Sequence, residues 1–178
     1  MSQEFPKSGV GAFLPARAVV ALGSNLAGGY ASPVDLLEAA LSFFPGAGLP
    51  VLRRSCWWRS SAWPDPSGNE YRNGVAIVEA RMDAEATIGR LLEIEARFGR
   101  SRGTRNADRT LDLDLIDHAG LVMQSPRLTL PHPRAHERGF VMGPLSEIAP
   151  DWRHPGLGLT ASELAASARI ARDARPAR

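Results

Sequence analysis

Cysteine is almost missing from this sequence of 178 residues, in which Cys56 is the only example. A single thiol excludes an internal disulfide and a zinc site built from several cysteines, and it is typical of a protein kept in a reducing cytoplasm. The residue lies in the run Ser-Cys-Trp-Trp at residues 55–58, which predicts a strand. We therefore expect a cytoplasmic protein in which Cys56 is packed in the core and is not a catalytic nucleophile.

Long apolar stretches are also missing. No run approaches the ~20 residues that a membrane-spanning helix needs, and the N-terminus lacks a charged region followed by a continuous apolar one. The phosphate-binding sequence G-x-x-x-x-G-K-[S/T] does not occur, which excludes an ordinary Walker-type kinase. These absences predict a protein that stays in the compartment where it is made and has no membrane partner.

Lysine is the third scarce residue, because Lys7 is the only lysine among 21 basic residues. Arginine, which takes its place, offers a planar fork of donors suited to phosphate and carboxylate oxygens, although a GC-rich genome would produce the same bias. The formal net charge is +2 and the isoelectric point is near 9.2. The arginines fit an anionic small ligand, or a basic module that binds RNA or single-stranded DNA with help from Trp57, Trp58 and Tyr71.

The length and the hydrophobic fraction of 44% predict one well-buried domain. We place it at residues 17–172, after a loose extension at residues 1–16 and before a tail at residues 173–178. Apolar periodicity predicts strands at residues 18–22, 51–59, 71–80 and 111–116, with 121–123 as a candidate partner of the last, and helices at residues 33–44, 83–98 and 162–172. This order favours an α+β fold, a ferredoxin-like α/β sandwich with a mainly antiparallel sheet of four or more strands and helices packed on it.

Paired carboxylates give the most specific chemical signal. Residues 109–116 read Arg-Thr-Leu-Asp-Leu-Asp-Leu-Ile. Because successive side chains of a strand point to opposite faces, Asp112 and Asp114 would stand together, roughly 6.5 Å apart along the strand, while the three leucines face the core. Two carboxylates this close repel each other unless a cation intervenes, and Mg²⁺ takes oxygen ligands from carboxylates and substrate phosphates. The pattern favours a Mg²⁺ site over its alternative, two solvated acids on a half-exposed strand.

Arginines precede these acids in a segment that is broken by glycine. They are Arg100, Arg102, Arg105 and Arg109, and the glycines are Gly99 and Gly103. A flexible arginine-rich loop beside a metal site would clamp phosphates and close over them. The same run alone fits a solvated surface or a nucleic-acid patch, but next to paired acids it favours nucleotide phosphate.

A proline-punctuated stretch further along adds His132, Arg138 and Phe140. The histidine would donate a hydrogen bond to a phosphate oxygen or only stabilise a loop, and spacing does not decide between these roles. Tyr71 and Phe140 would be core residues or would sandwich a planar heterocycle. Asn73 lies on the same strand face as Tyr71, where its amide could pair with the donor and acceptor edge of such a ring.

Together these segments resemble the 6-hydroxymethyl-7,8-dihydropterin pyrophosphokinase family. The shared pieces are Ala-Leu-Gly-Ser-Asn-Leu at residues 21–26, Tyr-Arg-Asn at 71–73, the strand at 109–116, Pro-His-Pro-Arg at 131–134 and Arg-Gly-Phe at 138–140. They follow the family's order and approximate spacing over residues 18–155. The resemblance implies an ATP- and Mg²⁺-dependent diphosphotransferase, EC 2.7.6.3. Its reaction transfers pyrophosphate from ATP to the hydroxymethyl group of the dihydropterin, giving AMP and the pterin diphosphate in folate biosynthesis.

The resemblance also assigns roles to single positions. The catalytic group would be Arg100, Arg109, Asp112 and Asp114, and the last two would hold two Mg²⁺ ions. The contacts to ATP, the co-substrate, would come from Arg100, Arg102, Arg109, Arg127, Thr129, His132 and Arg138. The pterin would be bound by Gly23, Ser60, Trp63, Tyr71, Asn73 and Phe140, with Glu95 near the substrate. We expect a monomer with no nucleic-acid partner.

The chain departs from the family pattern at two places. Asn-Ala-Asp at residues 106–108 stands where the family often has Trp-Gly-Pro, which affects how the arginine-rich loop packs over ATP. Ser-Ser-Ala at residues 60–62 replaces a turn of the Thr-Pro-Pro type, which changes the lining of the pterin pocket. A catalytically inactive relative, which would bind nucleotide without turnover, is the third interpretation.

Overall fold

The structure is a computed structural model of the chain, and it describes residues 16–62, 65–99 and 110–177. Residues 1–15 of the predicted extension lie outside this described part. Within the three described ranges, no helix combines the length and the apolar character that crossing a membrane requires.

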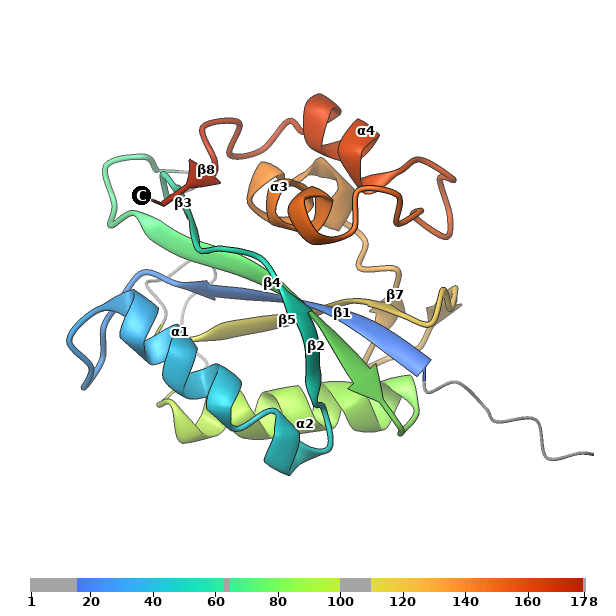
Figure 1. The fold of residues 1–178 in the computed structure, drawn as a ribbon, viewed down its shortest axis with the longest axis horizontal. Coiled ribbons are helices and arrows are strands. Elements are labelled where there is room, and N and C mark those ends of the chain that lie inside the picture. Colours follow the sequence, from blue (N-terminus) through green and yellow to red (C-terminus); the bar gives the residue numbers. More distant parts are fainter. Residues whose placement is uncertain (1–15, 63–64, 100–109, 178) are drawn as a thin grey trace, which may run out of the picture.

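One antiparallel sheet of six strands forms the centre of the fold (Figure 1). Its strand order is β5–β1–β4–β3–β8, and β2 pairs with β4 beside this path. The strands are β1 (Ala16–Ser24), β2 (Val51–Arg54), β3 (Trp58–Ser60), β4 (Tyr71–Ala80), β5 (Asp112–His118) and β8 (Arg175–Pro176). Every pairing in this sheet is antiparallel, and helices cover both faces, which confirms the predicted α+β sandwich.

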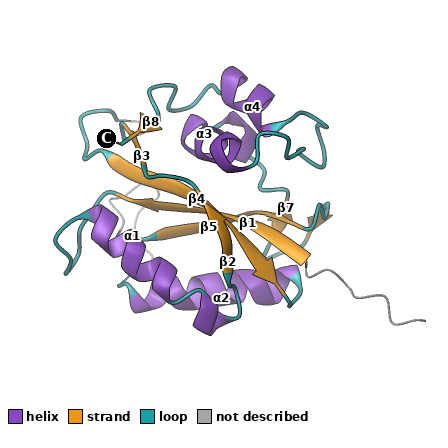
Figure 2. Ribbon diagram, viewed as in Figure 1, coloured by secondary structure: helices purple, strands orange, loops and turns teal. Residues whose placement is uncertain are grey.

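Two helices, α1 (Pro33–Ser42) and α2 (Ala84–Arg97), lie on one face of the sheet (Figure 2). Ser32 and Asp83 cap their N-termini, because each side chain accepts a backbone N–H of the first turn. Gly99 follows α2 with a φ of 76°, a left-handed conformation that suits glycine and ends the helix. Both helices therefore begin and end within two residues of the limits that the sequence predicts.

The central strand β1 is buried on both faces, so it separates two cores. Ala18, Val20 and Leu22 pack with α1 and α2, while Val19 and Ala21 pack with helices on the other side. This explains why residues 18–22 are a continuous apolar run without polar alternation.

Helices α3 (Gly139–Ile148) and α4 (Ala161–Ser167) cover the second face. The sequence did not predict α3, because glycines and an internal Pro144 give it a poor helical signal. Packing compensates: an added Cβ at Gly143 would lie 2.5 Å from the Trp58 ring, so the glycine lets α3 approach β3 closely. The last helix ends at Ser167, and the predicted extent to residue 172 is wrong because residues 168–177 leave α4 and run towards β3.

The predicted strand at residues 51–59 is wrong in its middle. It is two short strands, β2 and β3, separated by residues 55–57. Glu147 holds this break, accepting the backbone N–H of Cys56 at 2.8 Å and the indole N–H of Trp58 at 2.9 Å. The prediction of a packed core thiol is also wrong, since Cys56 is exposed. Partial burial and the Glu147 carboxylate raise the pKa of this thiol to about 11, which agrees with its not being a nucleophile.

A small second sheet lies beyond β5. Its strands β6 (Met123–Gln124) and β7 (Thr129–Leu130) pair with each other, so the pairing of residues 121–123 with the preceding strand is wrong. Two 3₁₀ turns, η1 (Pro45–Ala47) and η2 (Ala135–Glu137), follow α1 and precede α3. The hairpin and η2 bring residues 125–138 alongside β5, the strand that carries Asp112 and Asp114.

Candidate active site

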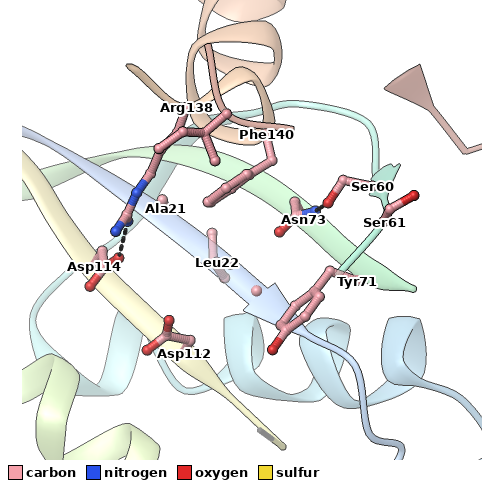
Figure 3. A pocket seen from close by; sticks show the side chains of 12 residues that line it. Ala21, Leu22, Ser60, Ser61, Tyr71, Asn73, Asp112, Asp114, Arg138 and Phe140 are labelled. Carbon is pink, nitrogen blue, oxygen red and sulfur yellow. Dashed lines mark hydrogen bonds and ion pairs between the residues drawn. The ribbon is translucent and has the colours of Figure 1, made fainter. Parts of the chain in front are cut away.

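A cleft opens on the α3 side of the sheet, where the C-terminal ends of β1 and β3 lie beside the N-terminal ends of β4 and β5 (Figure 3). Antiparallel register creates this gathering: Gly23 of β1 lies between Asp112 of β5 and Asn73 of β4. The cleft is lined by Ala21, Leu22, Gly23, Ser60, Ser61, Tyr71, Asn73, Asp112, Asp114, Arg138, Phe140 and Ile170. Residues that are up to about 150 positions apart in the sequence therefore face one space.

The two acids stand as the alternation of the strand predicts. Leu111, Leu113 and Leu115 are buried in the core with α1 and α2, while Asp112 and Asp114 line the cleft on the opposite face. Within the described ranges, no group of three or more His, Cys, Asp or Glu side chains could hold a metal ion. Two hard oxygen donors on one face fit an ion such as Mg²⁺, which keeps water and substrate oxygens as its remaining ligands.

Asp114 meets two basic side chains. The Arg138 guanidinium lies 3.4 Å from its carboxylate, and His132 Nε2 lies 3.9 Å from the same oxygen. About a third of the Asp114 side chain remains exposed (33%), so the carboxylate is accessible from the cleft despite these neighbours. The arrangement places one anionic group and one cation at the cleft floor.

His132 is held as a neutral hydrogen-bond donor. Its Nδ1 accepts the backbone N–H of Arg134 at 3.2 Å, so the proton of the neutral ring is on Nε2, which faces Asp114. Burial lowers the pKa of His132; Asp114 counteracts this shift and Arg138 adds to it. A neutral donor in this position can bind an anionic oxygen without bringing a full charge.

A second cleft adjoins the first and shares Asp114 with it. Its other lining residues are Ile88, Leu115, Ser125, Pro126, Arg127, Leu128, Thr129, His132 and Pro133. The hairpin is shaped by Ser125, whose hydroxyl accepts the backbone N–H of Arg127 at 3.3 Å and of Leu128 at 3.2 Å. Arg127, Thr129 and His132, which the resemblance assigns to ATP, thus lie together in this second cleft.

The described residues that the resemblance assigns to the pterin, namely all of them except Trp63, gather in the first cleft. Figure 3 shows Phe140 on the α3 side and Tyr71 on the sheet side, with Asn73 between them. Asn73 is buried, and its Nδ2 donates a hydrogen bond of 3.0 Å to the Ser60 hydroxyl. An added Cβ at Gly23 would lie 3.5 Å from Asn73 Oδ1, so glycine keeps this part of the floor open.

Glu95, expected near the substrate, is absent from the linings of both clefts. It is 1% exposed on α2, on the other side of the sheet, and its Oε1 accepts the backbone N–H of Leu113 at 2.7 Å. Since β5 is an edge strand, this bond satisfies a donor that no neighbouring strand pairs. Glu95 therefore supports the strand that carries both acids.

Five predicted site residues lie outside the described part of the chain. They are Trp63, Arg100, Arg102, Arg105 and Arg109. Conversely, sequence reasoning missed Ile170, which lines the first cleft, whereas Ser61 lies in the Ser-Ser-Ala segment that was expected to affect this lining. Ile170 is an isolated apolar residue after the last helix, and no local periodicity marks it.

Comparison with known proteins gives a consistent picture. Residues 19–150 match the family described as 7,8-dihydro-6-hydroxymethylpterin-pyrophosphokinase. The 2-amino-4-hydroxy-6-hydroxymethyldihydropteridine pyrophosphokinase of Synechocystis is 41% identical over 149 residues, 83% of this chain and 73% of that protein. The protein of the same name from Haemophilus influenzae is 36% identical over 135 residues, 75% of this chain and 82% of that protein.

Solved structures share the fold. The Plasmodium falciparum HPPK-DHPS A437G structure with SDX-DHP superposes with a TM-score of 0.67 at 13% identity, covering 86% of this chain. The match spans 45% of the Plasmodium chain, so this chain corresponds to less than half of that protein.

Proposed function

Because the chain belongs to the 7,8-dihydro-6-hydroxymethylpterin-pyrophosphokinase family, we propose that its two joined clefts hold the two substrates of that family's reaction. The chain is a pyrophosphokinase of folate biosynthesis. It transfers pyrophosphate from its co-substrate ATP to the hydroxymethyl group of 6-hydroxymethyl-7,8-dihydropterin and releases AMP. We also propose a monomeric, cytoplasmic enzyme without a nucleic-acid partner.

The pterin would occupy the first cleft. Tyr71 and Phe140 supply aromatic faces for a planar ring. Asn73 supplies the amide that reads its hydrogen-bonding edge, because the bond from Nδ2 to Ser60 fixes the orientation of the amide and Oδ1 lies beside Gly23. A ring held between two aromatic faces and one oriented amide has a fixed position for its hydroxymethyl group.

ATP would occupy the second cleft. Arg127 and Thr129 of the hairpin and His132 line it, and Arg138 stands where the two clefts join. A guanidinium and a neutral imidazole N–H are suited to the oxygens of a triphosphate. The arginines at 100, 102 and 109 remain predicted ATP contacts outside the described residues.

Asp112 and Asp114 would hold Mg²⁺, and we propose two ions. When bound, such ions would neutralise the negative charge of the triphosphate. Arg138 and His132 beside Asp114 would bind phosphate oxygens at the same point and orient them. The hydroxymethyl oxygen then attacks the β-phosphorus, the bond between this phosphorus and the oxygen of the α-phosphate breaks, and AMP carries that oxygen away.

One observation carries this proposal: Asp114 lines both clefts. Transfer between two substrates requires that their reacting ends meet at one point. The residue common to both clefts is a carboxylate with the Arg138 guanidinium beside it. The carboxylate suits a metal ion, and the guanidinium suits a phosphate oxygen.

The nature of the nucleotide product tests the proposal. The protein is incubated with ATP, Mg²⁺ and hydroxymethyl dihydropterin, and nucleotides are separated by anion exchange. AMP in equal amount to pterin diphosphate is the expected result. ADP instead of AMP would mean simple phosphoryl transfer and would overturn the proposal. Nucleotide binding without any product would identify an inactive relative.

A salt titration tests the nucleic-acid alternative. We expect RNA and single-stranded DNA to bind only weakly at physiological salt. Tight binding that falls steeply with salt and ignores Mg²⁺ would favour the basic module instead.

A further inference from the structure

The segment that follows α4 contacts two opposite walls of the first cleft. We name residues 168–177 the C-terminal strap. In Figure 1 the strap runs from α4, past α3, to β3. The sequence predicts a helix for its first half, where the structure has none, and a tail for the rest. Neither the proposed reaction nor the residue assignments above give the strap a role.

One end of the strap is bonded to the wall that carries Arg138 and Phe140. The Glu137 carbonyl accepts the backbone N–H groups of Arg169 and Ile170, each at 2.9 Å, and the Ile170 carbonyl accepts the N–H of Gly139 at 2.8 Å. The backbones approach so closely that an added Cβ at Gly139 would lie 2.6 Å from the Ala171 carbonyl oxygen. The backbone between Arg138 and Phe140 is therefore fixed against the strap, and Ile170 itself lines the cleft.

The other end of the strap is bonded to the opposite wall, formed by β3 and the residues after it. Strand β8 pairs with β3, placing Arg175 opposite Arg59. Just before β8, Asp173 Oδ2 accepts the backbone N–H of Ser61 at 2.7 Å. Ser61 lines the cleft, and it adjoins Ser60, whose hydroxyl holds the Asn73 amide.

The bond between Asp173 and Ser61 is charge-assisted. Burial raises the pKa of Asp173, but the hydrogen bonds from Ser61 outweigh this, and the net pKa is lowered. A lowered pKa means that the folded protein stabilises the ionised carboxylate. At neutral pH the acceptor of the Ser61 N–H is therefore charged, which strengthens the hydrogen bond. Ser61 belongs to a loop, so this bond fixes a wall whose position no regular element determines.

We propose that Asp173 is a positioning residue for the pterin: through Ser61 it sets the wall beside Asn73, and the C-terminal strap keeps this wall at a fixed distance from Phe140. This inference rests on the proposed function, since it assumes that the first cleft receives the pterin. It assigns Asp173 no role in ATP binding, because its contact with Ser61 involves no residue of the second cleft.

Kinetics of three variants test the role. Asp173→Ala removes the acceptor of the Ser61 N–H, and we expect the KM for the pterin to rise about five-fold, the size of effect that one lost hydrogen bond gives. The KM for ATP and kcat should stay within about two-fold of wild type, because the second cleft is untouched. Asp173→Asn should restore the pterin KM, since an amide oxygen accepts the same N–H.

A destabilised control separates positioning from stability. Thr160→Ala removes the capping box of α4 and lowers the melting temperature without touching the cleft. It should leave the pterin KM unchanged. Calorimetric binding of the pterin, with a non-hydrolysable ATP analogue present, gives the same comparison without turnover.

The outcomes are distinct. An unchanged pterin KM in Asp173→Ala overturns the positioning role, and so does a parallel rise in the KM values for the pterin and for ATP. A rise in Thr160→Ala equal to that in Asp173→Ala would also overturn it, since loss of stability would then explain both. Failure of the wild-type protein to form AMP would refute the proposed function instead.

Discussion

The Asn73 amide donates a hydrogen bond of 3.0 Å to the Ser60 hydroxyl, so two neighbouring strands fix the orientation of one buried side chain in the cleft. The bond engages Nδ2, and Oδ1 lies beside Gly23, where an added Cβ would come within 3.5 Å of it. An amide with a fixed orientation discriminates between donors and acceptors of a ligand, whereas a rotating amide does not.

Replacing this amide should weaken pterin binding selectively. We expect Asn73→Ala to raise the KM for the pterin at least about ten-fold, because a site built around hydrogen bonds loses a directional partner. Steady-state kinetics with each substrate varied in turn measure the effect, and the KM for ATP should stay within about two-fold. Ser42→Ala, an exposed position at the end of α1, serves as the control. Equal rises in both KM values would contradict the assignment of Asn73 to the pterin.

Glu95 should matter through the strand it supports. Glu95→Ala leaves the buried N–H of Leu113 without this acceptor, and we expect the free energy of unfolding to fall by roughly 1–3 kcal/mol. The turnover rate should fall as well, because Leu113 lies between the two acids. Glu95→Gln keeps an acceptor and should be close to wild type.

Urea unfolding measures this change in stability. The control is Glu93→Ala, which removes only an exposed ion pair with Arg90 and should change the free energy of unfolding by less than about 1 kcal/mol. If Glu95→Ala were as stable as Glu93→Ala, the supporting role would be wrong.

His154 should make stability depend on pH. It is 6% exposed, its Nδ1 accepts two backbone N–H groups at 3.2 Å, and burial, with His136 nearby, lowers its pKa below 6.5; Asp117 opposes the shift. The folded state therefore prefers the neutral ring, and the unfolded state binds more protons below pH 6.5. This contribution to stability is complete above pH 6.5 and is lost as the pH falls from there towards the lowered pKa.

Melting temperatures between pH 5 and pH 8 test this sign. His154→Asn keeps an acceptor for the two backbone N–H groups but does not titrate, so its melting temperature should fall less than that of wild type on acidification. Parallel curves for the two proteins would show that His154 does not contribute to the pH dependence.

Local patterns predicted the parts of the fold that local physics determines. Ser32 and Pro33 locate the start of α1, and the alternation in residues 111–116 places Asp112 and Asp114 on one face. Helix α3 escaped prediction because its stability comes from packing against Trp58 and the second core, which its own glycine-rich sequence does not reveal.

The site shows the same division. The sequence indicates that Tyr71 and Asn73 share a face, and the resemblance groups them with Phe140. The register that places Gly23 between Asp112 and Asn73 is a tertiary fact, as are the two clefts that meet at Asp114. Neither the inward position of Glu95 nor the bond from Ser61 to Asp173 leaves a local signal, because each joins segments far apart in the sequence.

Neutralising the paired carboxylates tests the central claim most directly. Asp112→Asn and Asp114→Asn keep the side-chain shape and remove the charge. The rate of AMP formation at saturating Mg²⁺ is compared with that of Asp151→Asn, which changes an exposed acid that lines neither cleft. We predict that each cleft variant loses at least about a thousand-fold in rate, the scale of several kcal/mol that metal-assisted charge stabilisation supplies. Both should keep a wild-type melting temperature, and Asp151→Asn should keep full activity. Near-normal AMP formation by Asp114→Asn would contradict the account.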